Sequence, residues 1–170
     1  MVLIDQTALP HEERWLTLRD VDGVCEAIRM LRVRGAPLLG LAGAGALAIA
    51  AETRGVNDAA LRAAADEIIG TRPTAVDLGT VTRRALAAAL AEPLEERRAA
   101  ALWAFATGFA EQRAAEDAAI GAFGAELIAP GSAVLTHCNA GGLATAGIGT
   151  ALGVVRAAFE QGRLTGCYAT

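Results

Sequence analysis

The sequence contains no lysine, so all 15 of its basic residues are arginine, and they form no long basic block. Aromatic residues make up only 4% of the chain although 54% of it is hydrophobic, and alanine supplies much of that apolar content. The formal net charge is −4. Because nucleic-acid binding needs clustered basic side chains that neutralise phosphates, this composition argues against a nucleic-acid partner.

Cysteine is also scarce. Cys25, Cys138 and Cys167 form an odd set without Cys-x-x-Cys spacing, so we expect neither a disulfide framework nor a metal site. We interpret Cys25 and Cys167 as small buried packing residues. Because free thiols persist in reducing compartments, we expect a cytoplasmic protein.

We expect no hydrophobic stretch to be long enough for a typical membrane span. The first residues, MVLIDQTALPHEER, include an acid early and lack the apolar core of a signal peptide. The apolar run 35–51 is rich in glycine and alanine and is shorter than the about 20 residues that a span needs. We therefore expect an interior helix there, in a protein without a membrane partner.

Residues 1–129 have mainly helical patterning and are predicted to form an N-terminal domain. The segments 2–5 and 14–18 are typical of a small hairpin. Apolar residues at helical spacing, candidate N-caps and helix-opening prolines predict helices behind Asp20, from Pro37, over 61–68, from Pro73, and from about residue 95 to about residue 129.

The pattern changes over residues 130–170, which we expect to begin a second domain. A Pro-Gly-Ser break precedes a short apolar strand candidate at 133–138, a helix is predicted over 143–162, and a second strand is predicted over 164–170. A strand, helix and strand in this order predict a parallel sheet and the α/β class. One such unit cannot cover both faces of its sheet, so we expect an incomplete sheet within these residues.

Two stretches place an arginine close to a predicted helix start. Arg34 and Gly35 precede the helix expected from Pro37, and Arg72 precedes the one expected from Pro73. A helix start offers free N–H groups and partial positive charge, and an arginine adds a bidentate donor for oxyanions. Two such sites indicate a phosphorylated small molecule. The alternative is that both arginines are solvated residues in ordinary turns.

The stretch LTHCNAGGLATAGIGTALG, residues 135–153, combines Cys138 with five glycines after a strand candidate. Its spacing is not that of a dinucleotide-binding loop. Glycines such as Gly141 still allow a ligand close to the backbone at the carboxyl end of a strand, and Asn139 either contacts that ligand or caps a turn. Cys138 is either a reactive thiol at this edge or a buried small residue. His137 alternates with it and should face the other way.

Four separated motifs then resemble one family in order along nearly the whole chain: DQTALP, the segment 15–40, TRPTAVDLG, and VLTHCNAGGLATAGIGTALGVVRAA. They are similar to methylthioribose-1-phosphate isomerase, which is related to ribose-1,5-bisphosphate isomerase and to regulatory subunits of the initiation-factor exchange complex. The resemblance implies a helical domain followed by a Rossmann-like domain, a homodimer, no cofactor, and isomerisation of an aldose 1-phosphate to a ketose in methionine salvage.

The resemblance also assigns residues. It places Arg34, Gly35, Ala36 and Arg72 on the sugar-phosphate substrate and makes Cys138 the catalytic cysteine, with Asn139 and Gly141 beside it. The family's catalytic aspartate lies in a second half that these residues do not include, so we expect this chain alone to be inactive. Two alternatives remain: a non-catalytic regulatory subunit that binds a sugar phosphate or nucleotide, and a degenerate product without activity.

Overall fold

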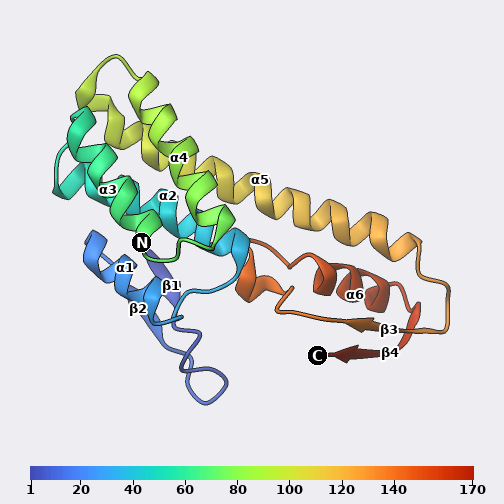
Figure 1. Cartoon of the computed structure of the whole chain (residues 1–170). Coiled ribbons are helices and arrows are strands. Elements are labelled where there is room, and N and C mark those ends of the chain that lie inside the picture. Colours follow the sequence, from blue (N-terminus) through green and yellow to red (C-terminus); the bar gives the residue numbers. More distant parts are fainter. The chain divides into compact units, whose positions relative to one another are not determined.

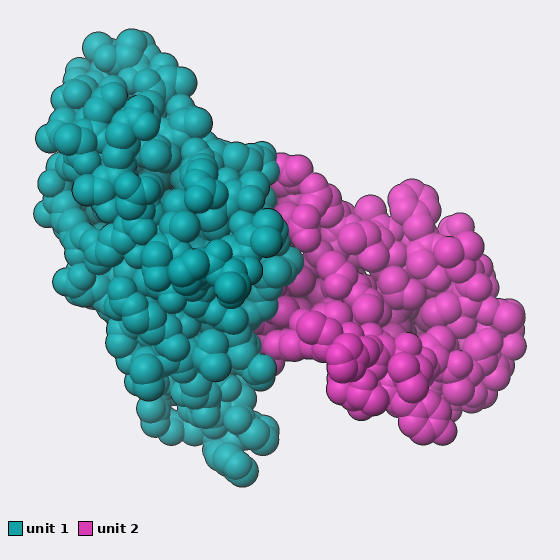
Figure 2. Space-filling model, in the orientation of Figure 1, with its two compact units in different colours: residues 1–109 teal, residues 110–170 magenta.

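The computed structural model describes all 170 residues. The chain forms two compact units, Met1–Phe109 and Ala110–Thr170, which Figure 2 colours separately. One long helix, α5 (Arg98–Glu126), contributes residues to both units.

The N-terminal unit combines the expected hairpin with the expected helices. Strands β1 (Val2–Ile4) and β2 (Trp15–Thr17) pair antiparallel. They are followed by α1 (Val21–Arg29), α2 (Ala36–Thr53), α3 (Asp58–Gly70), α4 (Val76–Ala91), the 3₁₀ turn η1 (Glu95–Arg97) and the first part of α5 (Figure 1). Asp20 caps α1, because its Oδ1 accepts a hydrogen bond from the Gly23 N–H at 2.7 Å.

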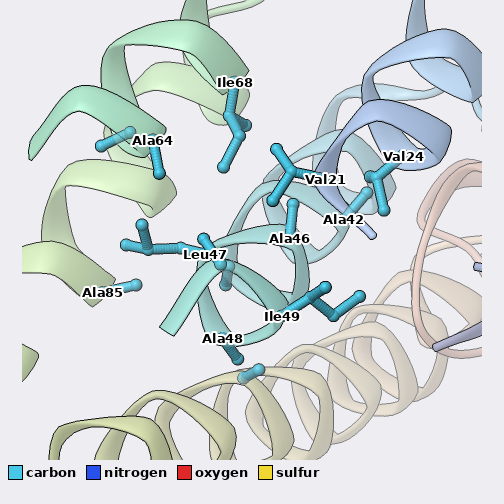
Figure 3. Close-up of a cluster of buried hydrophobic side chains, with 14 of the residues drawn as sticks. Val21, Val24, Ala42, Ala46, Leu47, Ala48, Ile49, Ala64, Ile68 and Ala85 are labelled. Carbon is cyan, nitrogen blue, oxygen red and sulfur yellow. The ribbon is translucent and has the colours of Figure 1, made fainter. Parts of the chain in front are cut away.

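Helix α2 forms the centre of this unit, in contact with α1, α3 and α4. Every residue from Ala42 to Ala51 is buried. Figure 3 shows its side chains gathered with Val21 of α1, Ile68 of α3 and Ala85 of α4. The apolar run 35–51 is therefore an interior helix, as the sequence predicts.

The same helix is long and apolar enough to cross a membrane when judged by length and composition alone, and no other helix of the chain is. However, 67% of that stretch is buried inside the protein. A core helix that is apolar all round satisfies the same criteria, and the burial of α2 fits that description.

Glycines allow α4 to approach α2 closely. A Cβ at Gly43 would lie 2.3 Å from Thr82 Oγ1 and 2.8 Å from Leu78 Cδ1. A Cβ at Gly40 would lie 2.7 Å from Val81 Cγ2. No side chain fits at these distances, so the spacing of the two helices depends on glycine at both positions.

Helices α4 and α5 have boundaries that differ from the expected ones. Helix α4 begins at Val76 and not at Pro73, because residues 72–75 form a turn in which the Ala75 N–H donates to the Arg72 carbonyl at 2.9 Å. Helix α5 ends at Glu126 and not near residue 129, because its last turn tightens, with the Leu127 N–H donating to the Gly124 carbonyl at 3.2 Å.

The C-terminal unit contains the expected βαβ arrangement. Strands β3 (Ser132–Thr136) and β4 (Leu164–Ala169) pair parallel, and the connection between them holds the 3₁₀ turn η2 (Gly142–Ala144) and helix α6 (Ala151–Glu160) (Figure 1). The parallel pair confirms the α/β class. Leu135 and Tyr168 are neighbours in this sheet and are 71% and 67% exposed, so one face is uncovered, as a single βαβ unit requires.

Helix α6 starts eight residues later than predicted, at Ala151 instead of residue 143. Gly149 has a φ of +91° and pairs with Gly141 in an antiparallel bridge, so the chain between them cannot continue as a helix. Residues 137–150 form instead one long glycine-rich segment, which we call the glycine loop.

The boundary between the compact units also lies earlier than the expected end of the N-terminal domain at residue 129. The last part of α5 packs on α6 and so groups with the C-terminal unit. A Cβ at Gly121 would lie 3.1 Å from the Gly153 carbonyl oxygen, and one at Gly124 would lie 2.5 Å from Val154 Cγ2. These glycines bring the two helices into contact.

We predict opposite effects for two glycine-to-alanine substitutions. Gly43→Ala should lower the free energy of unfolding by about 1–3 kcal/mol, because its methyl group overpacks the contact of α2 with α4. Gly108→Ala should raise it by about 0.5–1 kcal/mol, because this helical position has no heavy atom within 4 Å of the added Cβ. Urea unfolding followed by far-ultraviolet circular dichroism measures both. Equal effects at the two positions would contradict the close α2–α4 approach.

Candidate functional site

The turn that carries Arg34 leads directly into α2. Gly35 has a φ of +108°, which glycine adopts without strain, and it occupies the N-cap position. No side chain caps this helix start, and Pro37 lies in its first turn as expected. Arg34 is exposed, and its guanidinium makes no hydrogen bond or ion pair. An uncapped helix start with a free guanidinium beside it can bind an oxyanion.

Asp5 and Gln6 hold this turn in place, a role that the sequence did not reveal although both lie in one of the recognised motifs. The Gln6 N–H donates to the Arg32 carbonyl at 2.9 Å, and Gln6 Nε2 donates to the Arg34 carbonyl at 3.2 Å. Asp5 is buried and pairs with Arg32 at 2.8 Å. The only sequence signal was an acid close to the N-terminus, inside the motif DQTALP.

The carboxyl group of Asp5 is held in its charged form. Its Oδ1 accepts hydrogen bonds from the Thr7 hydroxyl at 2.6 Å and the Thr7 N–H at 3.0 Å. The Thr7 hydroxyl contributes most to lowering the pKa of Asp5, and the Thr7 N–H and Arg32 add to it, whereas burial acts in the opposite direction.

Arg72 lies four residues before the first residue of α4, Val76. A Cβ at Gly40, one turn into α2, would lie 3.2 Å from the backbone oxygen of Asp77 in the first turn of α4, so the starts of the two helices are close together (Figure 1). Arg72 is half-buried, and its guanidinium makes no hydrogen bond or ion pair. Helix α4 also begins without a side-chain cap. The structure thus brings together the starts of the two helices that follow the predicted anion-binding stretches.

Cys138 lies two residues beyond the end of β3, in the glycine loop. It is exposed, so its interpretation as a buried small residue is wrong. Its φ is +78°, an uncommon conformation for a residue with a side chain. The Cys138 N–H donates to the Thr170 carbonyl at 3.2 Å, and the Cys138 carbonyl accepts from the Ala140 N–H at 3.1 Å. His137 interacts with the Thr170 hydroxyl at 2.7 Å and makes no hydrogen bond to Cys138.

The other two cysteines have different environments. Cys25 is buried in the core as expected, and burial raises the pKa of its thiol to about 11. Cys167 was expected to be buried, but it lies exposed on β4, where the Val134–Cys167 pair belongs to an edge that no further strand covers. Only Cys138 combines exposure with a place in the glycine loop.

Asn139 and Gly141 follow Cys138 in the same loop. Asn139 is exposed and makes no hydrogen bond, so it does not cap a turn. Gly141 is buried against Leu152 of α6 and bridges to Gly149. The chain has no cluster of three or more His, Cys, Asp or Glu side chains that could hold a metal ion. The candidate functional groups are the guanidinium groups of Arg34 and Arg72, which can bind an oxyanion, and the thiol of Cys138.

Replacement of Asp5 should destabilise the N-terminal unit in a pH-dependent way. Asp5→Asn should cost about 1.5–3 kcal/mol at neutral pH, because it removes charged hydrogen bonds. Since folding lowers the pKa of Asp5, its contribution is present above the ordinary value of 3.8 and is lost as the pH falls through the folded-state value. The difference between the two proteins in urea unfolding should therefore shrink at acid pH. Asp66→Asn, at an exposed residue without a hydrogen bond, is the control, and a pH-independent difference for Asp5→Asn would contradict the assignment.

Several known proteins are similar to this chain in sequence and in fold. A methylthioribose-1-phosphate isomerase of Anaeromyxobacter sp. (strain K) is 52% identical over 167 residues, which cover 98% of this chain and 47% of that protein. A putative methylthioribose-1-phosphate isomerase of Archaeoglobus fulgidus is 47% identical, with 95% and 49% covered. The chain spans about half the length of the curated relatives that it matches.

Two solved structures are also similar to this chain. The 5-methylthioribose 1-phosphate isomerase of Pyrococcus horikoshii OT3 matches with a TM-score of 0.88 at 32% identity, over 98% of this chain and 48% of that one. The delta subunit of translation initiation factor eIF-2B from A. fulgidus matches with a TM-score of 0.86 at 43% identity, over 97% and 50%. The family model described as the initiation factor 2 subunit family matches residues 32–170. The resemblance found in the sequence is confirmed, and the chain belongs to the initiation factor 2 subunit family.

Proposed function

We propose that this chain supplies the N-terminal half of a methylthioribose-1-phosphate isomerase, which converts the aldose 1-phosphate to methylthioribulose 1-phosphate. The observation that carries the proposal is the 52% identity to a protein of that name along 98% of the chain. The exposed thiol of Cys138 and the two unpaired arginines, Arg34 and Arg72, are the groups that such a reaction could use.

In this proposal the phosphate binds at the starts of α2 and α4. Arg34 and Arg72 supply charged donors, and Gly35 and Ala36 let the phosphate approach backbone N–H groups. Asn139 and Gly141 contact the sugar. The uncapped helix starts support this assignment, because a helix N-terminus without a capping side chain leaves its first N–H groups to a ligand.

Cys138 acts as the general acid in this proposal. Because C1 of the substrate carries a phosphate ester, simple ring opening cannot give a free aldehyde. Protonation of the ring oxygen opens the ring while the phosphate stays attached to C1. A hydride then moves from C2 to C1, and the C2 hydroxyl loses its proton to a second acid–base group, which leaves a ketone at C2. The reaction is an isomerisation without net oxidation and needs no cofactor. The resemblance supplies a second acid–base group, an aspartate, from outside these 170 residues.

The same proposal covers the rest of the protein. The β3–α6–β4 unit would be the first part of a Rossmann-like sheet, whose uncovered face the remaining half of the protein packs against. The complete protein would be a cytoplasmic homodimer with a small-molecule substrate and neither a nucleic-acid nor a membrane partner. The second candidate, a non-catalytic regulatory subunit, is favoured by the match to the eIF-2B delta subunit.

Cys138→Ser should lower turnover by at least about a hundredfold in the complete protein, because it removes the general acid. The serine is nearly the same size, so the fold should be unchanged. Cys167→Ser is the matched control, since it alters the other exposed thiol. A coupled assay for methylthioribulose 1-phosphate measures both. Wild-type turnover in Cys138→Ser would exclude the assigned role.

Arg34→Ala and Arg72→Ala should each weaken binding of the sugar phosphate by about 1.5–3 kcal/mol, the range for a charge-assisted hydrogen bond. Lysine should restore only part of the loss, because an ammonium lacks the planar fork of a guanidinium. Isothermal titration of the complete protein with substrate gives the affinities. Arg62→Ala, at an exposed arginine of α3, should bind like the wild type. Equal affinities for all four proteins would mean that Arg34 and Arg72 are only turn residues.

The 170-residue chain should show no isomerase activity by itself, because the second acid–base group comes from elsewhere. Activity should appear when the half of the Anaeromyxobacter relative that this chain does not span is added as a second polypeptide. The assay uses chain purified free of host isomerase, with Cys138→Ser as the control. Turnover by the chain alone that disappears in Cys138→Ser would show that the acid is already present. Inactivity of the combined halves, with sugar phosphate still bound, would favour the regulatory subunit.

A further inference from the structure

Asp117 is a fully buried acid in α5 to which neither the sequence motifs nor the proposed reaction gives a role. Its Oδ2 accepts a hydrogen bond from the Gly149 N–H at 3.2 Å, across 32 positions in sequence. Its other oxygen, Oδ1, is buried without a partner in the protein. A buried carboxyl group with one hydrogen bond is costly, so its single hydrogen bond to the glycine loop requires an explanation.

The glycine loop lies directly against α5 around Asp117. A Cβ at Gly147 would lie 3.0 Å from the Cα of Ala114 and 3.1 Å from Asp117 Oδ2. The Gly147 N–H is itself bound to the Thr145 hydroxyl at 3.2 Å. The far side of the loop therefore has no room to move toward the helix, and Asp117 provides its side-chain anchor there.

Gly149 connects Asp117 to the segment that carries Cys138. It pairs with Gly141 in an antiparallel bridge, and a Cβ at Gly149 would lie 2.5 Å from both the Ala140 carbonyl oxygen and the Gly141 Cα. The Ala140 carbonyl also accepts from the Leu152 N–H at 3.3 Å, at the start of α6. Ala140 is thus fixed by Gly149 on one side and by α6 on the other.

Cys138 is held between this fixed segment and the end of the sheet. Its carbonyl accepts from the Ala140 N–H at 3.1 Å, and its N–H donates to the Thr170 carbonyl at 3.2 Å. Its φ of +78° is unfavourable for a residue with a Cβ, and such a conformation persists only where the surroundings enforce it. The contacts from Asp117 through Gly149 and Ala140 form one continuous connection to Cys138.

From this connection we infer that Asp117 is the positioning residue for Cys138: its carboxyl group anchors Gly149 and thereby keeps the cysteine in its left-handed conformation. Its effect on catalysis rests on the proposed function, whereas its effect on the conformation of Cys138 does not. The alternative is that Asp117 only contributes to general stability, without an influence on the loop.

The first test compares Asp117→Ala, Asp117→Asn and Glu111→Ala in the 170-residue chain. Asparagine keeps an oxygen that can accept the Gly149 N–H, and Glu111 is an exposed acid of the same unit without a partner. Carbon-13 shifts of labelled cysteine report the backbone conformation of Cys138, with Cys138→Ser to assign its signal, and amide hydrogen exchange reports the protection of Gly149.

In Asp117→Ala we expect the Cys138 shifts to move toward random-coil values and exchange at Gly149 to become at least about tenfold faster. Asp117→Asn and Glu111→Ala should match the wild type in both measurements. Unchanged shifts in Asp117→Ala would overturn the inference. So would an Asp117→Asn protein that behaves like Asp117→Ala, because the hydrogen-bond acceptor would then not be what matters.

The second test uses the combined halves. Asp117→Ala should lower kcat by at least about tenfold and leave KM within about threefold, because the thiol is misplaced while the phosphate site is intact, and Asp117→Asn should recover kcat. A fall in kcat that asparagine does not restore would overturn the positioning role. If the wild-type halves show no turnover, the proposed function fails, and the cysteine shifts still decide whether Asp117 positions Cys138.

Discussion

The close contact of α2 with α4 determines how the core of the N-terminal unit is packed and where both helices begin. It depends on Gly40 and Gly43, where any side chain would collide with Val81, Leu78 or Thr82. Because the helices meet near their N-terminal ends, the same contact that builds the core also sets the starts of both helices side by side. The turn that carries Arg34 is in addition held by the hydrogen bonds of Gln6 to the Arg32 and Arg34 carbonyls.

The C-terminal unit repeats this use of glycine for a different purpose. Gly121 and Gly124 bring α5 against α6, and Gly147 and Gly149 bring the loop against α5 and against its own first residues. Small residues allow the backbone itself to form the contact surfaces, so few side chains are needed to define the loop. In this arrangement one buried polar side chain, Asp117 of α5, binds the backbone of the loop through the Gly149 N–H.

Much of the fold could be predicted from the sequence, because its helices carry clear signals. The cap at Asp20 and the apolar run of α2 gave the correct elements, and the order of strand, helix and strand gave the parallel pair. The predicted start of α6 is wrong. The helical periodicity of the sequence continues through residues whose conformation is set by the bridge between Gly141 and Gly149. Local patterns do not contain such long-range pairing.

For the same reason, some residues of the candidate site could be predicted from the sequence and others could not. Arg34 stood out because it precedes Gly35, and Cys138 stood out because it begins a segment rich in glycine; the structure has positive φ values at Gly35 and Cys138. Asp5 and Asp117 did not stand out, because each acts on a segment about 30 positions away in sequence (27 to Arg32 and 32 to Gly149). An acid in a helix surrounded by alanine gives no sign of being buried until its helix is placed.

Cys138 is not the residue that its own backbone conformation favours. A φ of +78° is easiest for glycine, and glycine is abundant in this loop. Leu31 has a similar φ of +59°, but it directly follows the C-cap of α1, where left-handed residues are common. Cys138 follows a strand and has no such cause. The proposed function gives a reason for a side chain at this position, because it uses a thiol that glycine lacks, and the exposure of Cys138 leaves that thiol accessible.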